Sequence, residues 1–250
     1  MHSTLFTIFG LPIRAYGLMM VVGFCVGLWR AVRVAKRRDI DADRVYDLAL
    51  VVLLSGIIGS RLVYILLNSQ TESFSRFFAV WEGGLSFHGG VIFALLAGYI
   101  YTRRTKLSYL QMADLFAPSV AIAYAFTRVG CFLNGCCYGC PTSLPWGVRF
   151  LENGTLTPPS HPTQIYATIA NLIIFAILTR LENLKRANGF VFVSYLGLYG
   201  IYRFLVEFLR NGYSAQEWIC GLTQAQWVSI VMIVASLAVI LTVYRRPSSK

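Results

Sequence analysis

The sequence predicts an all-α integral membrane protein with about seven transmembrane helices. Only 13% of its 250 residues are charged, 56% are hydrophobic, and the mean hydropathy is +0.61. A soluble domain carries about 25% charged residues. Apolar runs of about 20 residues, long enough to cross about 30 Å of hydrocarbon, recur along the chain. Lysine and arginine also cluster in alternate loops between these runs, as in multi-pass proteins.

The predicted spans are the apolar runs 16–35, 45–67, 88–102, 113–131, 162–180, 189–208 and 225–244. The third run is short and begins within a Gly-rich stretch, so we expect its helix to enter from a partly embedded loop. The first 15 residues have neither a basic start nor a small-residue cleavage site, so the first run is expected to stay as a helix. We expect a single polytopic domain over residues 1–250.

The basic residues predict the orientation of the chain. Of the 22 lysines and arginines, 15 lie in four clusters, at 30–44, 103–106, 180–186 and 245–250. Because positive charge concentrates on the cytoplasmic side, the N-terminus is expected outside and the C-terminus in the cytoplasm. The net charge of +11 is then mostly a topology signal. No nucleic-acid partner is expected, since no soluble domain offers a basic face.

Two predicted outer segments, 68–87 and 132–161, are too long to be simple turns. The second contains PTSLPWGVRFLENGTLTPPSHP, whose prolines and glycines disfavour a regular helix. We therefore expect a small irregular cap on the outer face.

Three arginines, Arg61, Arg128 and Arg203, fall inside or at the outer ends of predicted spans. An arginine at bilayer depth is costly, so three in one half of the membrane require a reason. Snorkelling, or pairing with Asp114 or Glu207, would account for a lone arginine. Three that converge on the outer leaflet favour an anionic ligand.

Other polar side chains are predicted at the same level. His88 lies between glycines, and because histidine side chains can exchange a proton near neutral pH, it could transfer one; the alternative is a helix-end histidine bonded to a carbonyl. Tyr16 and Tyr199 could each present a hydroxyl at the outer interface, where tyrosine is also a common anchor.

The stretch YRFLVEFLR places Arg203, Glu207 and Arg210 at helical positions i, i+4 and i+7, which share one face. A salt-bridged face of this kind is common in water and rare in lipid.

The stretch RVGCFLNGCCYGC, residues 128–140, holds four of the six cysteines. Cys137 and Cys140 form one CxxC pair, but Cys131 and Cys136 supply no second spaced pair. Zinc or an iron–sulfur cluster is therefore not expected. A disulfide, packing as small apolar side chains, and a catalytic thiol all remain open.

Several stretches together resemble the prolipoprotein diacylglyceryl transferases of bacterial inner membranes. In order they are IRAYGLM, GSRLVYIL, GGLSFHGG, MADLFAPSVAIAYAFTRVGCFLNGCCYG, HPTQIYA and YRFLVEFLR. Such enzymes move a diacylglyceryl group from phosphatidylglycerol to the thiol of the lipobox cysteine in a secreted precursor. The resemblance implies a multi-pass inner-membrane enzyme with its active site toward the periplasmic or outer face. It implies phosphatidylglycerol and a prolipoprotein signal peptide as partners, and no metal or organic cofactor.

The resemblance also implies site residues. Those expected to be catalytic are His88, Arg128, Arg203 and Tyr16. Of those expected to bind substrate besides the two arginines, Asn134 and Gly139 match family residues. Glu207, Arg210, Arg61 and Tyr199 are expected from their own charge or hydroxyl and their predicted position near the outer face.

Two positions depart from a familiar form of the family signature, GRIGNFINGE. Its first asparagine is Cys131 here, and its glutamate is Cys136. Neither family side chain is then indispensable if this protein is active. We interpret the cysteines as a variant of a packed turn that shapes the lipid site.

These assignments predict a mechanism. Arg128 and Arg203 would bind the phosphodiester and stabilise the departing glycerol phosphate. His88 would take the proton of the acceptor thiol, which attacks as a thiolate and forms a thioether. One alternative is a transporter or flippase for an anionic lipid, with basic residues along both halves of a path. The other is a structural membrane protein, which leaves the arginines unexplained.

Overall fold

The structure is a computed structural model that describes residues 4–8, 11–69, 77–78, 83–152, 154–184, 186–210 and 217–244. Seven α-helices and three short β-hairpins lie in these ranges. The chain forms two compact units: Met1–Arg30 with Ala113–Lys250, and Ala31–Met112. The single-domain expectation remains a prediction.

The helices confirm the predicted all-α membrane class. They are α1 (Ala15–Arg37), α2 (Ala42–Leu67), α3 (Phe87–Arg104), α4 (Tyr109–Asn134), α5 (Thr163–Leu181), α6 (Phe190–Glu207) and α7 (Gln224–Thr242). Six of them are long and apolar enough to cross a membrane, and α3 is the helix outside that set. Helix α3 corresponds to the apolar run that was expected to be short. Glycines near its start and arginines at its end lower its mean hydropathy.

Helix α4 ends later than predicted. The apolar run stops near residue 131, but the helix continues to Asn134, and the cap therefore begins inside the expected segment 132–161. The helix ends where Gly135 takes a φ of 74°, a left-handed conformation that glycine adopts without steric cost.

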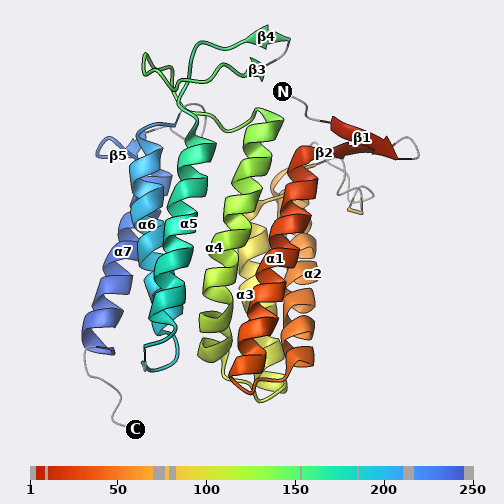
Figure 1. The fold of residues 1–250 in the computed structure, drawn as a ribbon, viewed down its shortest axis with the longest axis vertical. Helices are drawn as coiled ribbons and strands as arrows, with labels where there is room; N and C mark the ends of the chain where they lie inside the picture. The colour runs from red at the N-terminus through yellow and green to blue at the C-terminus, as the bar shows by residue number, and fades with distance from the viewer. Residues whose placement is uncertain are drawn as a thin grey trace. The chain divides into compact units, whose positions relative to one another are not determined.

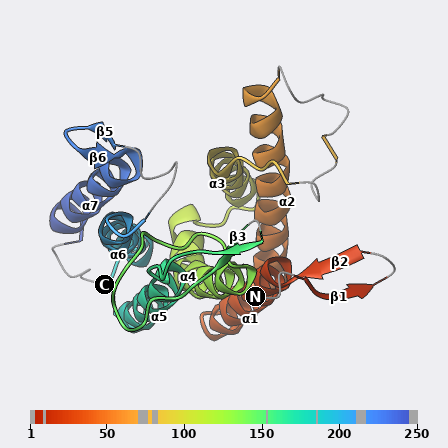
Figure 2. The same cartoon turned by 90° about the horizontal axis from the view of Figure 1, so that it is seen from above.

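In the first unit, α6 lies between α5 and α7 (Figure 2). Helices α4, α5 and α6 share a buried apolar core of Ala117, Ala121, Ile174, Leu178 and Val191. Because two of these side chains are alanines, the helix backbones approach closely, as is usual where helices pack in a membrane.

Glycines on α1 likewise allow its backbone to approach the backbone of α4 closely. A Cβ at Gly23 would lie 2.8 Å from the carbonyl oxygen of Ala123, and one at Gly27 would lie 2.9 Å from that of Ser119. A side chain larger than hydrogen would therefore force α1 away from α4. The spacing Gly23-x-x-x-Gly27 is thus a packing feature.

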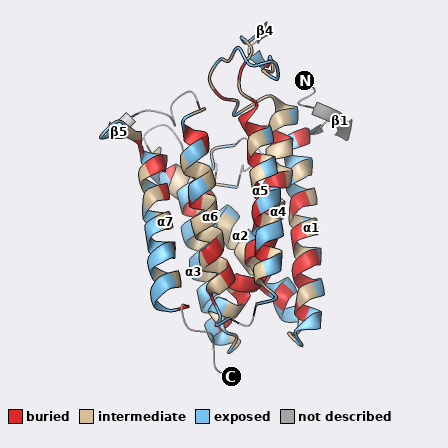
Figure 3. Cartoon of the chain, turned by 60° about the vertical axis from the view of Figure 1, so that its left-hand side comes forward, coloured by how far each residue is buried: buried red, intermediate tan, exposed pale blue. Residues whose placement is uncertain are grey.

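The side of α7 that faces away from the other helices is apolar, as expected for a surface in contact with lipid. Val228, Val231, Val234, Leu237 and Leu241 recur every three or four residues and are between 53% and 64% exposed. Figure 3 shows these exposed turns in pale blue along α7. An apolar stripe of this length is unfavourable in water and favourable against acyl chains.

Short hairpins and irregular chain join the helices. The hairpins are β1–β2 (Thr4–Ile8, Leu11–Arg14), β3–β4 (Leu151–Glu152, Thr155–Leu156) and β5–β6 (Glu217–Ile219, Leu222–Thr223). The connection from α4 to α5 carries β3–β4 beyond the ends of these helices (Figure 1), which agrees with the expected irregular cap. In the other expected cap segment, 70–76 and 79–82 lie outside the described residues.

The second unit is built on α2 and α3. Ser86 caps the N-terminus of α3, and its N–H donates to the Ser60 carbonyl of α2 at 2.9 Å. A Cβ at Gly89 would lie 2.6 Å from the Cβ of Val63. The glycines after His88 therefore serve close packing of the two helices.

Candidate functional site

Arg128 lies near the end of α4 and is half-buried. Its Nη2 donates to the hydroxyl of Tyr124, one turn earlier, and its guanidinium carbon lies 4.7 Å from the centroid of that ring. Its Nε is buried and has no hydrogen-bond partner among the described residues. Because a buried donor without a partner costs free energy, an acceptor from a bound molecule would be stabilising here.

Tyrosines surround this arginine. The rings of Tyr124 and Tyr199 meet edge to face at 5.8 Å, and Tyr199 meets Tyr202 at 5.8 Å. Tyr202 interacts electrostatically with both Arg128 and Arg203. Tyr199, expected as an interface hydroxyl, thus packs within the tyrosine group that links the two arginines.

A buried carboxylate organises the end of α6. The side chain of Glu207 is 0% exposed and pairs with Arg203, while Nε of Arg210 lies 3.8 Å from the same oxygen. Thr223, the N-cap of α7, donates to the other carboxylate oxygen at 3.2 Å. Because the single carboxylate of Glu207 faces the guanidinium groups of both Arg203 and Arg210, this group of three side chains carries a net positive charge. The expected alignment of these three charged residues is therefore present, with Arg210 just beyond the helix.

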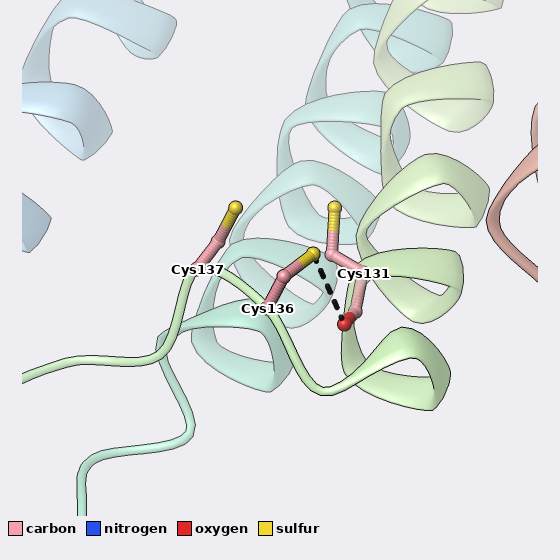
Figure 4. A group of neighbouring side chains, drawn as sticks. All are labelled: Cys131, Cys136 and Cys137. Carbon is pink, nitrogen blue, oxygen red and sulfur yellow. Dashed lines mark hydrogen bonds between the residues drawn. The ribbon is translucent and has the colours of Figure 1, made fainter. Parts of the chain in front are cut away.

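The cysteine loop turns back on α4. Gly135 and Cys137 have φ of 74° and 66°, and the N–H of Cys136 donates to the Cys131 carbonyl at 3.1 Å. As Figure 4 shows, this reversal sets the thiols of Cys131, Cys136 and Cys137 beside one another. Their sulfur atoms all lie within 4.8 Å of one another. All six cysteines are free thiols.

The first turn of α5 holds the loop in place. Thr163 donates to the Cys137 carbonyl and Gln164 to the Cys136 carbonyl, each at 2.7 Å. Gln164 is 1% exposed. These two bonds satisfy loop carbonyls just beyond the end of α4.

Gly139 lies where three segments meet. Its N–H donates to the His161 carbonyl at 2.9 Å, and it forms a bridge with Arg210. A Cβ at this position would collide with the carbonyl of Leu209 and lie 2.8 Å from the Thr163 methyl. Close packing thus accounts for a glycine here, and its assignment to substrate binding stays a prediction.

Charge around the loop favours a thiolate. The pKa of Cys137 lies well below its usual range, because the thiols of Cys131 and Cys136 hydrogen-bond to its sulfur. Arg128 and Arg210 lower it further. Cys137 is also exposed, so the site carries an accessible thiol with thiolate character.

Tyr16 and Asn134 lie at the same end of the first unit. Tyr16 is the second residue of α1 and is 38% exposed; a Cβ at Gly130 of α4 would lie 3.1 Å from its Cα. Asn134 is the last residue of α4, beside Cys136. Asn134 therefore lies less than two helical turns after Arg128 on α4, and Tyr16 packs against α4 at Gly130, close to the same turn.

The second unit holds the other two predicted residues. Arg61 is 2% exposed, and its Nη1 donates to the carbonyls of Gly83 and Gly84 at 2.8 and 3.1 Å. Arg61 thus anchors the Gly-rich segment to α2. His88 is the second residue of α3 and is exposed, with its ring 5.8 Å from that of Phe87. An exposed imidazole is accessible to an acceptor thiol, as a base requires.

Sequence reasoning missed Tyr124, Thr163, Gln164 and Thr223. Tyr124 precedes Arg128 by four residues, a helical spacing that could have suggested the contact. Thr223 and Gln226 form a capping box in the structure, and their three-residue spacing was the available signal. The contacts of Thr163 and Gln164 depend on the fold and left no local signal.

Apolar helices define a multi-pass membrane protein, and its half-buried arginines form a net positive cluster. Residues 3–242 match the family described as prolipoprotein diacylglyceryl transferase. The chain belongs to this family.

Relatives named phosphatidylglycerol–prolipoprotein diacylglyceryl transferase match nearly the whole chain. The protein of Geobacter sulfurreducens is 36% identical over 243 residues, which cover 94% of this chain and 93% of the relative. That of Clostridium tetani is 33% identical, with 96% of each chain covered. That of Clostridioides difficile is 35% identical, with 95% and 93% covered.

Proposed function

We propose that this protein transfers the diacylglyceryl group of phosphatidylglycerol to the cysteine thiol of a prolipoprotein. Family membership over nearly the full length carries this proposal. The named relatives are transferases, and nothing favours the alternative of a lipid transporter or flippase.

The anionic phosphate is the group that the arginines recognise. Arg128 has a buried Nε available for an acceptor, and Arg203 lies beside a carboxylate that fixes its position. Guanidinium groups match phosphodiester oxygens with paired hydrogen bonds. They stabilise the charge that grows on the glycerol phosphate as it leaves. Arg210, Asn134 and Tyr16 are the further proposed contacts in this unit.

The reaction forms one bond and breaks one. The acceptor sulfur attacks the glyceryl carbon, a C–S bond forms, and the C–O bond to phosphate breaks with its electron pair on the phosphate oxygen. His88 takes the thiol proton as base, because its exposed imidazole is accessible to the acceptor thiol. The product is a thioether, and the released group is glycerol phosphate. No metal or organic cofactor takes part in these steps.

We place the protein in the bacterial inner membrane with this site toward the outer face. The acceptor cysteine lies in the lipobox at the end of a signal peptide, which reaches that face during secretion. The basic clusters of the sequence support this orientation.

One assay tests the proposal. Purified protein in proteoliposomes receives phosphatidylglycerol labelled in the acyl chains and a lipobox peptide with one cysteine. Labelled thioether peptide is the expected product, and a peptide with serine in place of cysteine is the matched control. Movement of label between leaflets without thioether would support a flippase instead and contradict the proposal.

A further inference from the structure

Three thiols meet at the end of α4, and nothing in the transferase reaction requires them. Cys131 lies on the helix, and the left-handed turn at Gly135 and Cys137 brings the next two cysteines back to it. The conformation of Cys137 is unusual, because residues with a Cβ rarely adopt positive φ. The carbonyl contacts of Thr163 and Gln164 hold this turn. The three thiols therefore lie together on a braced backbone (Figure 4).

The spacing of the sulfur atoms suits one metal ion. Because each pair lies within 4.8 Å, some point lies no more than about 2.8 Å from all three sulfurs (4.8 Å divided by √3). Bonds from thiolate sulfur to a metal are about 2.3 Å long. Each sulfur needs to move by only about half an ångström, which small side-chain rotations provide.

The number and kind of ligands select the metal. Within the described residues, the group contains these three cysteines and no histidine, aspartate or glutamate. Structural zinc takes four ligands in a tetrahedron, which three thiols do not complete. Soft thiolates select copper(I), zinc or iron–sulfur clusters, and of these copper(I) accepts three thiolates in a plane. We propose that Cys131, Cys136 and Cys137 form a trigonal copper(I) site.

The charge of such a site fits its surroundings. Three thiolates and one copper(I) carry a net charge of −2. Arg128 and Arg210 interact electrostatically with Cys137 and would offset this charge. The thiol of Cys137 is exposed, so an ion in solution or on a carrier can reach it. The proposed transferase steps involve no metal, and the copper site would share Arg128 and Arg210 with the proposed phosphate contacts.

Two matched variants test the proposal. The cluster variant carries Cys25→Ser, Cys140→Ser and Cys220→Ser, and the counterpart carries Cys131→Ser, Cys136→Ser and Cys137→Ser. Each variant keeps three thiols, so non-specific copper binding by thiols should be the same in both. Copper(I) is added without oxygen, in competition with a coloured copper(I) chelator. We expect one ion per chain in the cluster variant and at least about 100-fold weaker binding in the counterpart.

X-ray absorption by the bound copper supplies the second readout, and three sulfur neighbours at one distance are expected. Equal affinity of the two variants, two sulfur neighbours, or equally tight binding of zinc would each overturn the proposal. Circular dichroism verifies that both variants are folded. If the triple counterpart fails to fold, Cys137→Ala in the cluster variant replaces it. Unchanged affinity in that replacement would be equally decisive against the site.

Discussion

Thr223 and Glu207 are joined by a hydrogen bond of 3.2 Å between the start of α7 and the end of α6. The same threonine oxygen accepts from the N–H of Gln226 and caps α7, also at 3.2 Å. Because the Thr223 hydroxyl holds Glu207, and Glu207 pairs with Arg203 and Arg210, this hydroxyl also helps to position both arginines. One side chain thus secures a helix end and the position of two proposed phosphate contacts.

Thr223→Val should therefore reduce both stability and transfer. It removes a helix cap and leaves an oxygen of the buried Glu207 without its donor, at a cost of about 1–3 kcal/mol. We expect a lower thermal unfolding temperature in detergent and a raised KM for phosphatidylglycerol. Thr223→Ser keeps the hydroxyl and should restore both. A serine variant as impaired as the valine variant would show that the hydroxyl is not the cause.

Arg128→Lys and Arg203→Lys should each lose most transferase activity, by about 10²–10³ in kcat, while the protein still folds. Lysine retains the charge but lacks the planar fork that pairs with a phosphodiester. Arg149→Lys, at an exposed position in the cap, is the control and should be nearly neutral. Thioether formation per unit of folded protein is the measurement. Near-normal turnover in both variants would rule out phosphate binding by these side chains.

Gly139→Ala should destabilise the fold, because the added methyl group would meet the carbonyl of Leu209. Overpacking of this kind costs about 1–3 kcal/mol. Gly17→Ala is the matched control, since no atom lies within 4 Å of a Cβ at that position. Thermal unfolding compares the two. Equal stability of both variants would mean that the loop shifts without cost.

Cys137 should react with iodoacetamide at nearly the same rate from pH 6 to pH 8. The neighbouring thiols lower its pKa, so the thiolate is already present at the acidic end of this range. A thiol with an ordinary pKa of about 8.5 reacts roughly 80-fold more slowly at pH 6 than at pH 8. Mass spectrometry locates the modified cysteine, and free cysteine is the reference. Replacing both donors, in the double variant Cys131→Ala with Cys136→Ala, should make the reaction more dependent on pH. A steep dependence in the unaltered protein would contradict the lowered pKa.

Reporter fusions should reveal the predicted orientation. Fusions after Arg38, Arg104 and Arg186 should report cytoplasm, because they follow basic clusters. Fusions after Ser69 and Gly154 should report the outer side. Paired reporters, one active only on each side of the membrane, make every fusion its own control. A reversal at any of these positions would disprove the seven-span arrangement.

The helices could be predicted because hydropathy and charge act locally. Long apolar runs marked six helices, and the weakest run became α3, the one helix outside the set long and apolar enough to span. The end of α4 was misplaced because the polar Asn134 still fits a helical turn, and the real stop is the backbone of Gly135.

The site could be predicted only in part. The helical spacing placed Arg203 and Glu207 on one face and left a salt bridge as the alternative to an anionic ligand; the structure pairs the two side chains. The cysteine group could not be predicted from spacing, because Cys131 joins the other two through a positive φ at Cys137 that cysteine rarely adopts. The bond from Thr223 joins side chains 16 residues apart across two helices, a distance at which sequence patterns carry no signal.

The apolar stripe on α7 has a consequence for biogenesis. Because Val231, Val234 and Leu237 are mostly exposed, this helix obtains little support from protein neighbours along that side. It must therefore leave the translocon on its own hydrophobicity, and its mean hydropathy of 2.1 meets that need. A lysine at Val234 would add about 2.5–3.5 kcal/mol to the cost of insertion. That cost would fall on membrane insertion and not on packing between helices.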